Sequence, residues 1–174
     1  MAGRRHTVLR PEAPFAGAYI TGDYRTWLWR SRFAHVKRAI GWVLNNPSTA
    51  DGEHNDPTVA KAWAFSTAWG YDSMVFVNTN PYRSTDPKLA KMPPEEVLVQ
   101  NDEWLRTIMT STLMVVCGWG DKANPELARR AVIVMHELGP LHALKVTKSG
   151  NPGHPLYLPG DLKPTLWNPD KCLH

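Results

Sequence analysis

Residues 39–50 read AIGWVLNNPSTA, and this stretch gives the clearest indication of the fold class. Its first half, Ala39–Leu44, is a short apolar run of strand length that carries no charge. Such a run is typical of a strand buried on both faces of a sheet. It stops at two asparagines and Pro47, residues that favour a turn. The stretch therefore predicts a central strand of an α/β protein that ends in a polar loop.

Three further apolar segments repeat this arrangement, and predicted helices separate them. The first predicted helix spans residues 57–69, with Asp56 as its N-cap and Pro57 at its first position. The other strand-like segments cover residues 73–78, 113–117 and 142–147, and the other predicted helices cover residues 93–110 and 125–138. This alternation predicts a three-layer α/β/α architecture with a central, mostly parallel four-stranded sheet.

The two ends of the chain have a different character. Residues 1–18 carry scattered prolines and charges, and we expect an N-terminal arm there, ahead of a single α/β domain over residues 19–174. Residues 19–30 are predicted to form a hairpin, because β-forming residues flank the turn pair Gly22-Asp23. The tail from Pro159 onward is polar and contains prolines, so we expect it to wrap the surface.

Composition narrows the class of protein. A chain of 174 residues with 43% hydrophobic and 21% charged residues fits one soluble domain with a core. Its two cysteines, Cys117 and Cys172, have no C-x-x-C spacing, which argues against a disulfide scaffold and a thiolate zinc site. No apolar run approaches the roughly 20 residues that span a bilayer. The basic start is followed by no long apolar stretch, so we expect a cytoplasmic monomer without membrane contact.

The charge balance points to an anionic partner. The formal net charge is +4 and the sequence pI is about 9.2, which favours DNA or a nucleotide as the partner. No phosphate-binding glycine loop and no Gly-x-Ser-x-Gly elbow is present. Asp51, His54 and Asp56 could together hold a metal, but three such residues in one loop bind none more often than not. We therefore expect neither a metal nor a cofactor.

Polar and small residues follow all four predicted strands. In parallel sheets these carboxyl ends meet at one edge, where α/β proteins bind their ligands. Taken singly, an Asn-Pro pair is usually a turn and a lone histidine is usually a surface residue. The candidates are Asn46, Pro47 and Ser48 after the first strand, Asn78, Tyr82 and Arg83 after the second, Gly118 and Trp119 after the third, and His154 and Leu158 after the fourth. Their joint placement predicts one site.

These motifs resemble two known groups of proteins. Asn-Pro after the first strand, Val-Phe-Val-Asn at the second, an apolar strand ending in Trp-Gly, and a late His-Pro resemble, in this order, the uracil-DNA glycosylase superfamily. More closely, residues 44–86, with Asn-Pro-Ser-Thr-Ala-Asp, Asn-Asp-Pro-Thr, Trp-Gly-Tyr and Tyr-Arg-Ser-Thr-Asp-Pro, resemble a bacterial and phage family, domain of unknown function 1643. That closer resemblance extends over about residues 19–160. It supplies no activity, whereas the superfamily implies a uracil-DNA-glycosylase-like fold and hydrolysis of an N-glycosidic bond.

The superfamily resemblance implies a role for each candidate. Asn46 and His154 would be catalytic, since Asn46 matches the residue that positions water and His154 matches the histidine that stabilises the anionic base as it leaves. Asn78 would read the base edge, and the target base would be flipped out of the duplex. The remaining base-binding candidates are Pro47, Ser48 and Tyr82, and the expected nucleic-acid contacts are Arg83, Gly118, Trp119 and Leu158, with Leu158 as the wedge into the duplex.

The sequence also departs from the superfamily pattern. Leu44 stands where the superfamily has glycine, and Asn46 is a weaker water activator than aspartate, because an amide is not a general base. The aromatic residue that stacks on the base has no clear equivalent; Trp63 and Phe65 are candidates, but both lie in a predicted helix. Three functions therefore stay open: a base-directed N-glycosylase, a catalytically inactive base- or nucleic-acid-binding protein of the same fold, and a hydrolase or transferase of free nucleotides.

Overall fold

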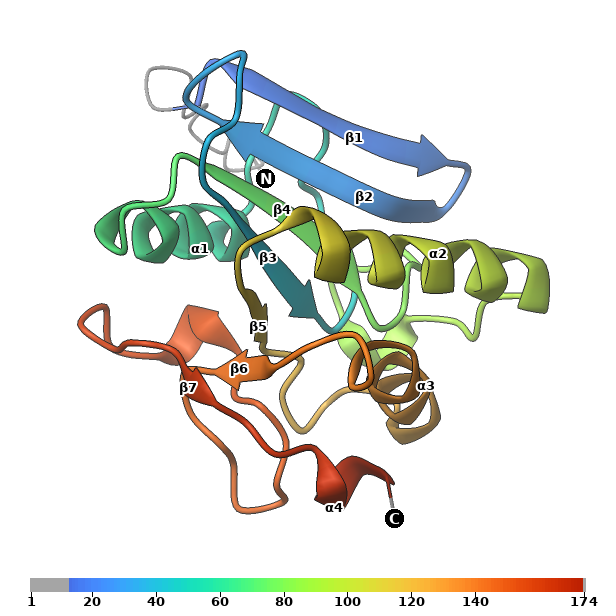
Figure 1. The fold of residues 1–174 in the computed structure, drawn as a ribbon. Coiled ribbons are helices and arrows are strands. Elements are labelled where there is room, and N and C mark those ends of the chain that lie inside the picture. The colour runs from blue at the N-terminus through green and yellow to red at the C-terminus, as the bar shows by residue number, and fades with distance from the viewer. Residues whose placement is uncertain (1–12, 174) are drawn as a thin grey trace, which may run out of the picture.

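The computed structural model describes residues 13–173, which fold into an α/β domain (Figure 1). Its strands form a seven-stranded sheet in the order β1-β2-β4-β3-β5-β6-β7. The strands are β1 (Phe15–Thr21), β2 (Tyr24–Ser31), β3 (Ala39–Leu44), β4 (Ser73–Asn78), β5 (Val115–Cys117), β6 (Leu141–Ala143) and β7 (Thr165–Leu166). The helices are α1 (Pro57–Ala68), α2 (Glu95–Ser111), α3 (Pro125–Met135) and α4 (Asp170–Leu173), with short 3₁₀ turns η1 (Pro87–Leu89) and η2 (Pro155–Tyr157). The predicted α/β class is confirmed.

The sheet is wider and more mixed than the four strands that the sequence predicts. The neighbours β4-β3, β3-β5 and β5-β6 are parallel, while β1-β2, β2-β4 and β6-β7 are antiparallel. The predicted hairpin forms, but it also joins the sheet, with Leu28 opposite Phe76. It joins because β2 has buried side chains, including Leu28, that would be exposed in a free ribbon.

Helices cover both faces of the sheet. On one face, α1 packs Val59, Ala62 and Phe65 against side chains of β3 and β4 such as Trp42 and Phe76. On the other face, residues of α2 and α3 pack against Val43, Val75 and Val115. Because successive residues of a strand point to opposite faces, both faces of the central strands are apolar and the strands are fully buried.

Helix starts follow their caps. The Asp56 side chain accepts a hydrogen bond of 2.9 Å from the backbone N–H of Val59, and Pro57 occupies the first turn of α1, as the sequence predicts. Asn124 caps α3 in the same way, through Glu126 and Leu127. The two caps differ in their surroundings, because Asp56 is buried whereas Asn124 is exposed and caps a helix on the other face of the sheet.

Both ends of the predicted domain differ from expectation. Residues 15–18 were expected in an arm, but β1 begins at Phe15, where it pairs with Ser31; residues 1–12 lie outside the described part of the chain. The fourth predicted strand is shorter, because β6 ends at Ala143. The tail does more than wrap the surface: β7 extends the sheet, and Trp167 is buried against the core. Between residues 13 and 173, no helix is long and apolar enough to cross a membrane.

Candidate functional site

The loops after β3 and β4 are hydrogen-bonded to each other at the carboxyl edge of the sheet. The backbone N–H of Thr79 donates to the carbonyl of Leu44 over 2.8 Å, and that of Ser84 donates to the carbonyl of Pro47 over 2.8 Å. These bonds continue the parallel pairing of β3 with β4 beyond the strands. Residues 44–50 and 78–84 therefore form one connected rim.

The loop that carries His154 closes on the same edge. A Cβ atom at Gly118 would lie 3.0 Å from Pro155 and 3.1 Å from Leu44, so glycine allows a closer approach here than a residue with a side chain would. The backbone N–H of Gly120 donates to the carbonyl of Pro152 over 2.8 Å. Gly118 thus packs between β3 and the His154 loop, and its nucleic-acid contact stays a prediction.

Asn78, the last residue of β4, is buried with its amide in a fixed orientation. Arg25 Nη2 donates to Asn78 Oδ1 over 3.3 Å, and Asn101 Nδ2 donates to the Asn78 carbonyl over 2.8 Å. Because arginine has donors only, the atom that faces it must be the amide oxygen. Asn78 Nδ2 has no hydrogen-bond partner among residues 13–173 and remains as a donor.

Arg25 is a buried cation that sequence reasoning missed. Its side chain is 3% exposed, and Nη1 donates to the Ala50 carbonyl over 2.9 Å. Burial lowers the pKa of Arg25 to about 10, an effect that the Asp56 carboxylate opposes and the Arg83 charge reinforces. Simple alternation along β2 would place the Arg25 side chain on the face opposite to α1, so the sequence pattern does not predict its burial there. A bulge opposite Tyr19 and Ile20 shifts the register and turns this side chain to the α1 face.

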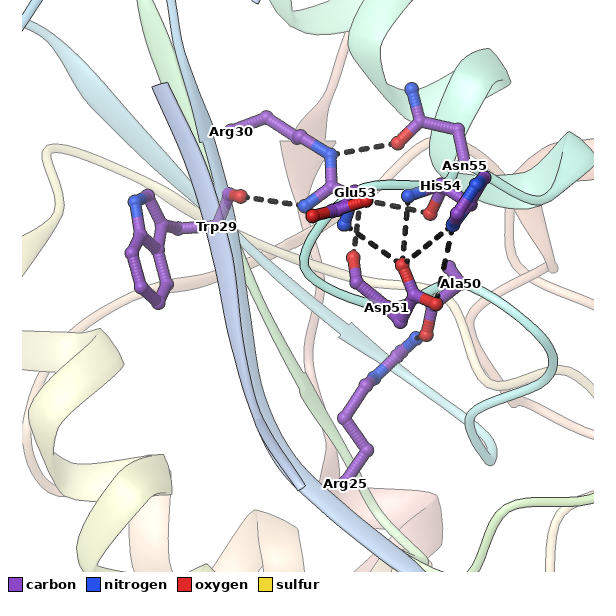
Figure 2. A network of polar contacts seen from close by, with 8 residues as sticks. All are labelled: Arg25, Trp29, Arg30, Ala50, Asp51, Glu53, His54 and Asn55. Carbon is purple, nitrogen blue, oxygen red and sulfur yellow. Dashed lines mark hydrogen bonds and ion pairs between the residues drawn. The ribbon is translucent and has the colours of Figure 1, made fainter. Parts of the chain in front are cut away.

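The other buried arginine of β2, Arg30, is fully engaged (Figure 2). It donates to Asn55 Oδ1 over 2.7 Å and to the carbonyls of Trp29, Asp51 and His54 over 2.8, 2.7 and 3.0 Å. All three guanidinium nitrogens therefore have acceptors. Arg30 holds the loop between β3 and α1 in place.

Asp56 combines its capping role with a position inside the site. It is 5% exposed, and it has no ion pair within the described residues. Its charge raises the pKa of both Arg25 and His154 against the lowering caused by burial. The negative charge of Asp56 therefore acts on both side chains. The Asp-Pro pair in the sequence predicts the cap, but it does not predict that the same carboxylate acts on Arg25 and His154.

His154 is half-buried and has a defined tautomer. It begins η2, where its Nδ1 accepts a hydrogen bond of 3.4 Å from the backbone N–H of Leu156. An accepting Nδ1 carries no proton, so the neutral ring has its proton on Nε2. Burial lowers the pKa of His154 below 6.5, with Asp56 acting in the opposite direction. At neutral pH His154 is an uncharged donor through Nε2.

Asn46 is anchored to the rim. Its Nδ2 donates to the carbonyls of Ser84, over 2.8 Å, and Pro47, over 3.2 Å, while its Oδ1 has no partner in the described chain. Pro47 is buried beside it, and the half-buried Ser48 makes no side-chain hydrogen bond with residues 13–173. Asn46 therefore presents an acceptor to the site and no basic carboxylate.

Tyr82 and Arg83 lie on different faces of the strand-like segment that pairs with the start of β2. Tyr24 and Tyr82 form an isolated antiparallel bridge, and their rings make an edge contact at 5.8 Å. Lys91 Nζ lies 5.8 Å from the Tyr82 ring. Because side chains alternate, Tyr82 faces away from Arg25, and Arg83 faces the same side as Arg25. This arrangement does not bring Tyr82 to Asn78, as the base-binding prediction requires.

Several aromatic and apolar candidates belong to the core instead. Trp119 is 1% exposed and packs edge-on against Trp167, so its side chain offers little surface to the predicted nucleic acid. Trp63 and Phe65 are buried in the α1 layer. Leu158 is half-buried and packs against that same layer, which leaves little of it to enter a duplex.

Tyr157 is the aromatic residue that sequence reasoning missed. It is 80% exposed, and its ring centroid lies 5.9 Å from that of His154. The signal was its position three residues after the histidine, in a turn that Pro155 begins. An exposed ring beside the site is placed to stack on a base.

The loop that Arg30 anchors is polar and adjoins these residues, between Ala50 and Asp56 (Figure 2). Asp51 Oδ1 accepts hydrogen bonds of 2.8 Å from the backbone N–H groups of Glu53 and His54, and His54 Nδ1 lies 3.1 Å from the same oxygen (Figure 2). Residues 13–173 contain no group of three or more His, Cys, Asp or Glu side chains that could hold a metal. A cavity of about 390 Å³ borders this loop; it is lined by Ala13, Pro14, Ala16, Arg30, Gly52, Glu53 and Asn55, and by no predicted site residue.

Comparison with known proteins gives a family. Residues 25–156 match the family described as "Protein of unknown function (DUF1643)". No curated protein and no solved structure matches the chain. The matched range includes Arg25 at its first position, as well as Asn46, Asn78 and His154, and it ends just before Tyr157. Since the match covers most of the chain, this protein belongs to the DUF1643 family.

Proposed function

We propose that this protein is a nucleobase-directed N-glycosylase-like hydrolase with a fold of the uracil-DNA glycosylase type. Its substrate is a base, in standard or modified form, in DNA or a nucleotide. The observation that carries the proposal is the neutral His154, whose Nδ1 accepts from Leu156 and whose Nε2 is left as a donor at the carboxyl edge. Neutral donors fixed at such an edge suit a reaction that develops negative charge on its leaving group.

The reaction breaks the bond between the sugar C1′ and a base nitrogen. The bonding electrons leave with the base, which becomes an anion, and the sugar becomes an oxocarbenium-like cation that water attacks. His154 Nε2–H donates to a carbonyl oxygen of the departing base and stabilises its charge. A neutral imidazole is effective here, because it is desolvated and already oriented before the reaction begins.

Two amides and one carboxylate supply the remaining roles. Asn78 Nδ2, free because Oδ1 accepts from Arg25, donates to an acceptor on the base edge. Asn46 Oδ1 accepts a hydrogen bond from the attacking water and orients it. The proton of that water passes to Asp56, a buried carboxylate that meets the need for a base that an asparagine leaves open. Tyr157 stacks on the flipped base.

Product analysis tests this function directly. Purified protein is incubated with a panel of standard and modified nucleosides, nucleotides and oligonucleotides, and released bases are identified by mass spectrometry. Release of one free base, together with an abasic sugar in equal amount, is the expected result. If no substrate loses its base while a nucleotide is cut at another bond, the chain is a nucleotide hydrolase or transferase instead.

A second candidate is a base-binding protein that performs no chemistry. The observation in its favour is Asn46, because the residue at the water position is an amide whose nitrogen is engaged by Ser84 and Pro47. Such a protein would retain oligonucleotide on a filter or column, lose it steeply as salt rises, and release no base.

A further inference from the structure

Two arginines at the carboxyl edge share one face. The backbone N–H of Arg25 donates to the Pro81 carbonyl, and that of Arg83 donates to the Asp23 carbonyl, on either side of the bridge between Tyr24 and Tyr82. In an antiparallel ladder, paired residues point to the same face, and the residues next to them along each strand point to the opposite face. Arg25 and Arg83 therefore stand diagonally across the ladder on one face, while the two tyrosines occupy the other.

Neither guanidinium forms an ion pair with a carboxylate within residues 13–173. Arg25 makes two side-chain hydrogen bonds, to the Ala50 carbonyl and to Asn78 Oδ1, and its Nε has no acceptor among residues 13–173. Arg83 Nε is buried and has no partner, and no side-chain hydrogen bond or ion pair engages Arg83 within that range. Burial is the main cause that lowers the pKa of Arg25; the nearby Asp56 carboxylate raises it and the Arg83 charge lowers it further.

Other unused donors lie on the same rim. Ala50, the acceptor of Arg25, and Pro47, the acceptor of the Ser84 N–H, flank Ser48, whose hydroxyl has no partner in the described chain. Asn78 Nδ2 is also unpaired there. Among these donors Arg83 Nε is fully buried, and a buried donor without an acceptor is costly, so the cluster favours a ligand that supplies acceptors.

We infer that Arg25 and Arg83, with the Ser48 hydroxyl, form a phosphate-binding subsite beside the base site. The substrate is then a base carried on a sugar phosphate, not a free base or an unphosphorylated nucleoside. The identity of the base rests on the proposed function, whereas the phosphate does not. A phosphate group fits this cluster because its several oxygens accept from more than one side chain at once, and guanidinium groups match its geometry.

Isothermal titration calorimetry tests the subsite. The protein is titrated with inorganic phosphate, with nucleoside 5′-monophosphates carrying each common base, and with the matching nucleosides. Wild-type protein is expected to bind at least one monophosphate on the order of tenfold or more tightly than its nucleoside, and less tightly as salt rises. Equal affinity for monophosphate and nucleoside would overturn the inference.

Variants locate the effect. Arg83→Gln is the primary variant, because its side chain is half-buried and makes no bond within the described chain, so the fold should persist. It should remove most of the preference for the monophosphate. Arg106→Gln is the control, since Arg106 lies on α2 and pairs with the exposed Glu103. An Arg83→Gln protein that keeps the full preference would contradict the assignment, as would an Arg106→Gln protein that loses it.

Two further arms separate the sources of the phosphate and the two proposals. A free nucleotide and a short oligonucleotide present the same chemistry, and titration with both identifies which one the subsite takes. Binding of phosphate without release of base from either would support the subsite and defeat the glycosylase function. Base release from unphosphorylated nucleosides, at the same rate as from nucleotides and unchanged in Arg83→Gln, would support the glycosylase function and defeat the subsite.

Discussion

The two buried arginines of β2 stand in contrasting surroundings. Arg30 donates four hydrogen bonds that use all three of its nitrogens, and it fixes the loop before α1. Arg25 donates two, and at the edge where it lies, Arg83 Nε and Asn78 Nδ2 are also without partners in the described chain. Most buried donors in folded proteins have an acceptor. The Arg30 loop therefore has its hydrogen bonds within the protein, whereas the carboxyl edge has donors that remain available to the proposed ligand.

The largest effect on activity is expected from a substitution of Asp56. Asp56→Asn should lower turnover on the best substrate by about 100-fold to 10,000-fold, the usual contribution of a general base. Asparagine caps a helix as well as aspartate does, so the melting temperature should change little. Turnover and thermal melting are both measured.

A matched cap serves as the control for that change. Asn124→Asp alters the charge of the cap of α3 and should leave turnover as it is. If Asp56→Asn retains wild-type turnover, Asp56 is a cap only, and the reaction must draw its base from elsewhere.

Replacing each buried arginine of β2 tests how much that arginine contributes to stability. Arg30→Ala should lower the free energy of unfolding by about 3–4 kcal/mol, because the carbonyls of Asp51 and His54 lose a charged donor. Arg25→Met should cost about half as much, since it loses two bonds and also relieves a buried charge. Urea denaturation measures both. Equal losses would mean that Arg25 is as structural as Arg30.

His154 offers a paired substitution. His154→Asn keeps an acceptor for the Leu156 N–H but loses the Nε2 donor, and turnover should fall by about 100-fold. His154→Gln places an amide N–H near the Nε2 position and should recover part of the rate. If both variants turn over at the wild-type rate, His154 stabilises no anion; if both fail to fold, its role is structural.

The smallest expected effect is the pH dependence that His154 gives to stability. Burial holds its folded pKa below 6.5, so as pH falls below 6.5 the unfolded chain takes up the proton first. The stability that depends on neutral His154 is therefore complete above pH 6.5 and declines below it, by less than about 1.4 kcal/mol per pH unit. Urea denaturation of wild type and His154→Gln at pH 7.5, 6.5 and 5.5 measures the slope. A slope that is identical in both proteins would assign the effect to other groups.

The sequence predicts the central strands and the helix starts well, because these depend on local patterns. The apolar runs of β3 and β4 and the Asp56-Pro57 cap appear in the structure at the expected positions. The antiparallel additions escape prediction. β7 has only two residues, and β2 alternates like a surface hairpin although it pairs with β4.

The site is harder to predict, because burial of single side chains is decided by tertiary packing. The sequence predicts Asn46, Asn78 and His154 as site residues, because they follow strands or precede a proline. It misses Arg25, whose direction depends on a one-residue bulge. It also selects Trp119 and not Tyr157 as the aromatic contact. In the structure Trp119 is buried against Trp167 of the C-terminal tail, while Tyr157 is exposed. No local pattern distinguishes those two outcomes.

NMR spectroscopy can compare the buried arginines Arg25 and Arg30 directly, together with Arg83. The Nε–H resonances of Arg25, Arg30 and Arg83 are followed by ¹H–¹⁵N NMR while the nucleoside 5′-monophosphate that binds most tightly is added. We expect the Arg25 and Arg83 resonances to shift until the site is saturated, because their donors gain an acceptor, and the Arg30 resonance to stay in place. A shift of Arg30 alone, or binding that leaves Arg25 and Arg83 unmoved, would contradict it.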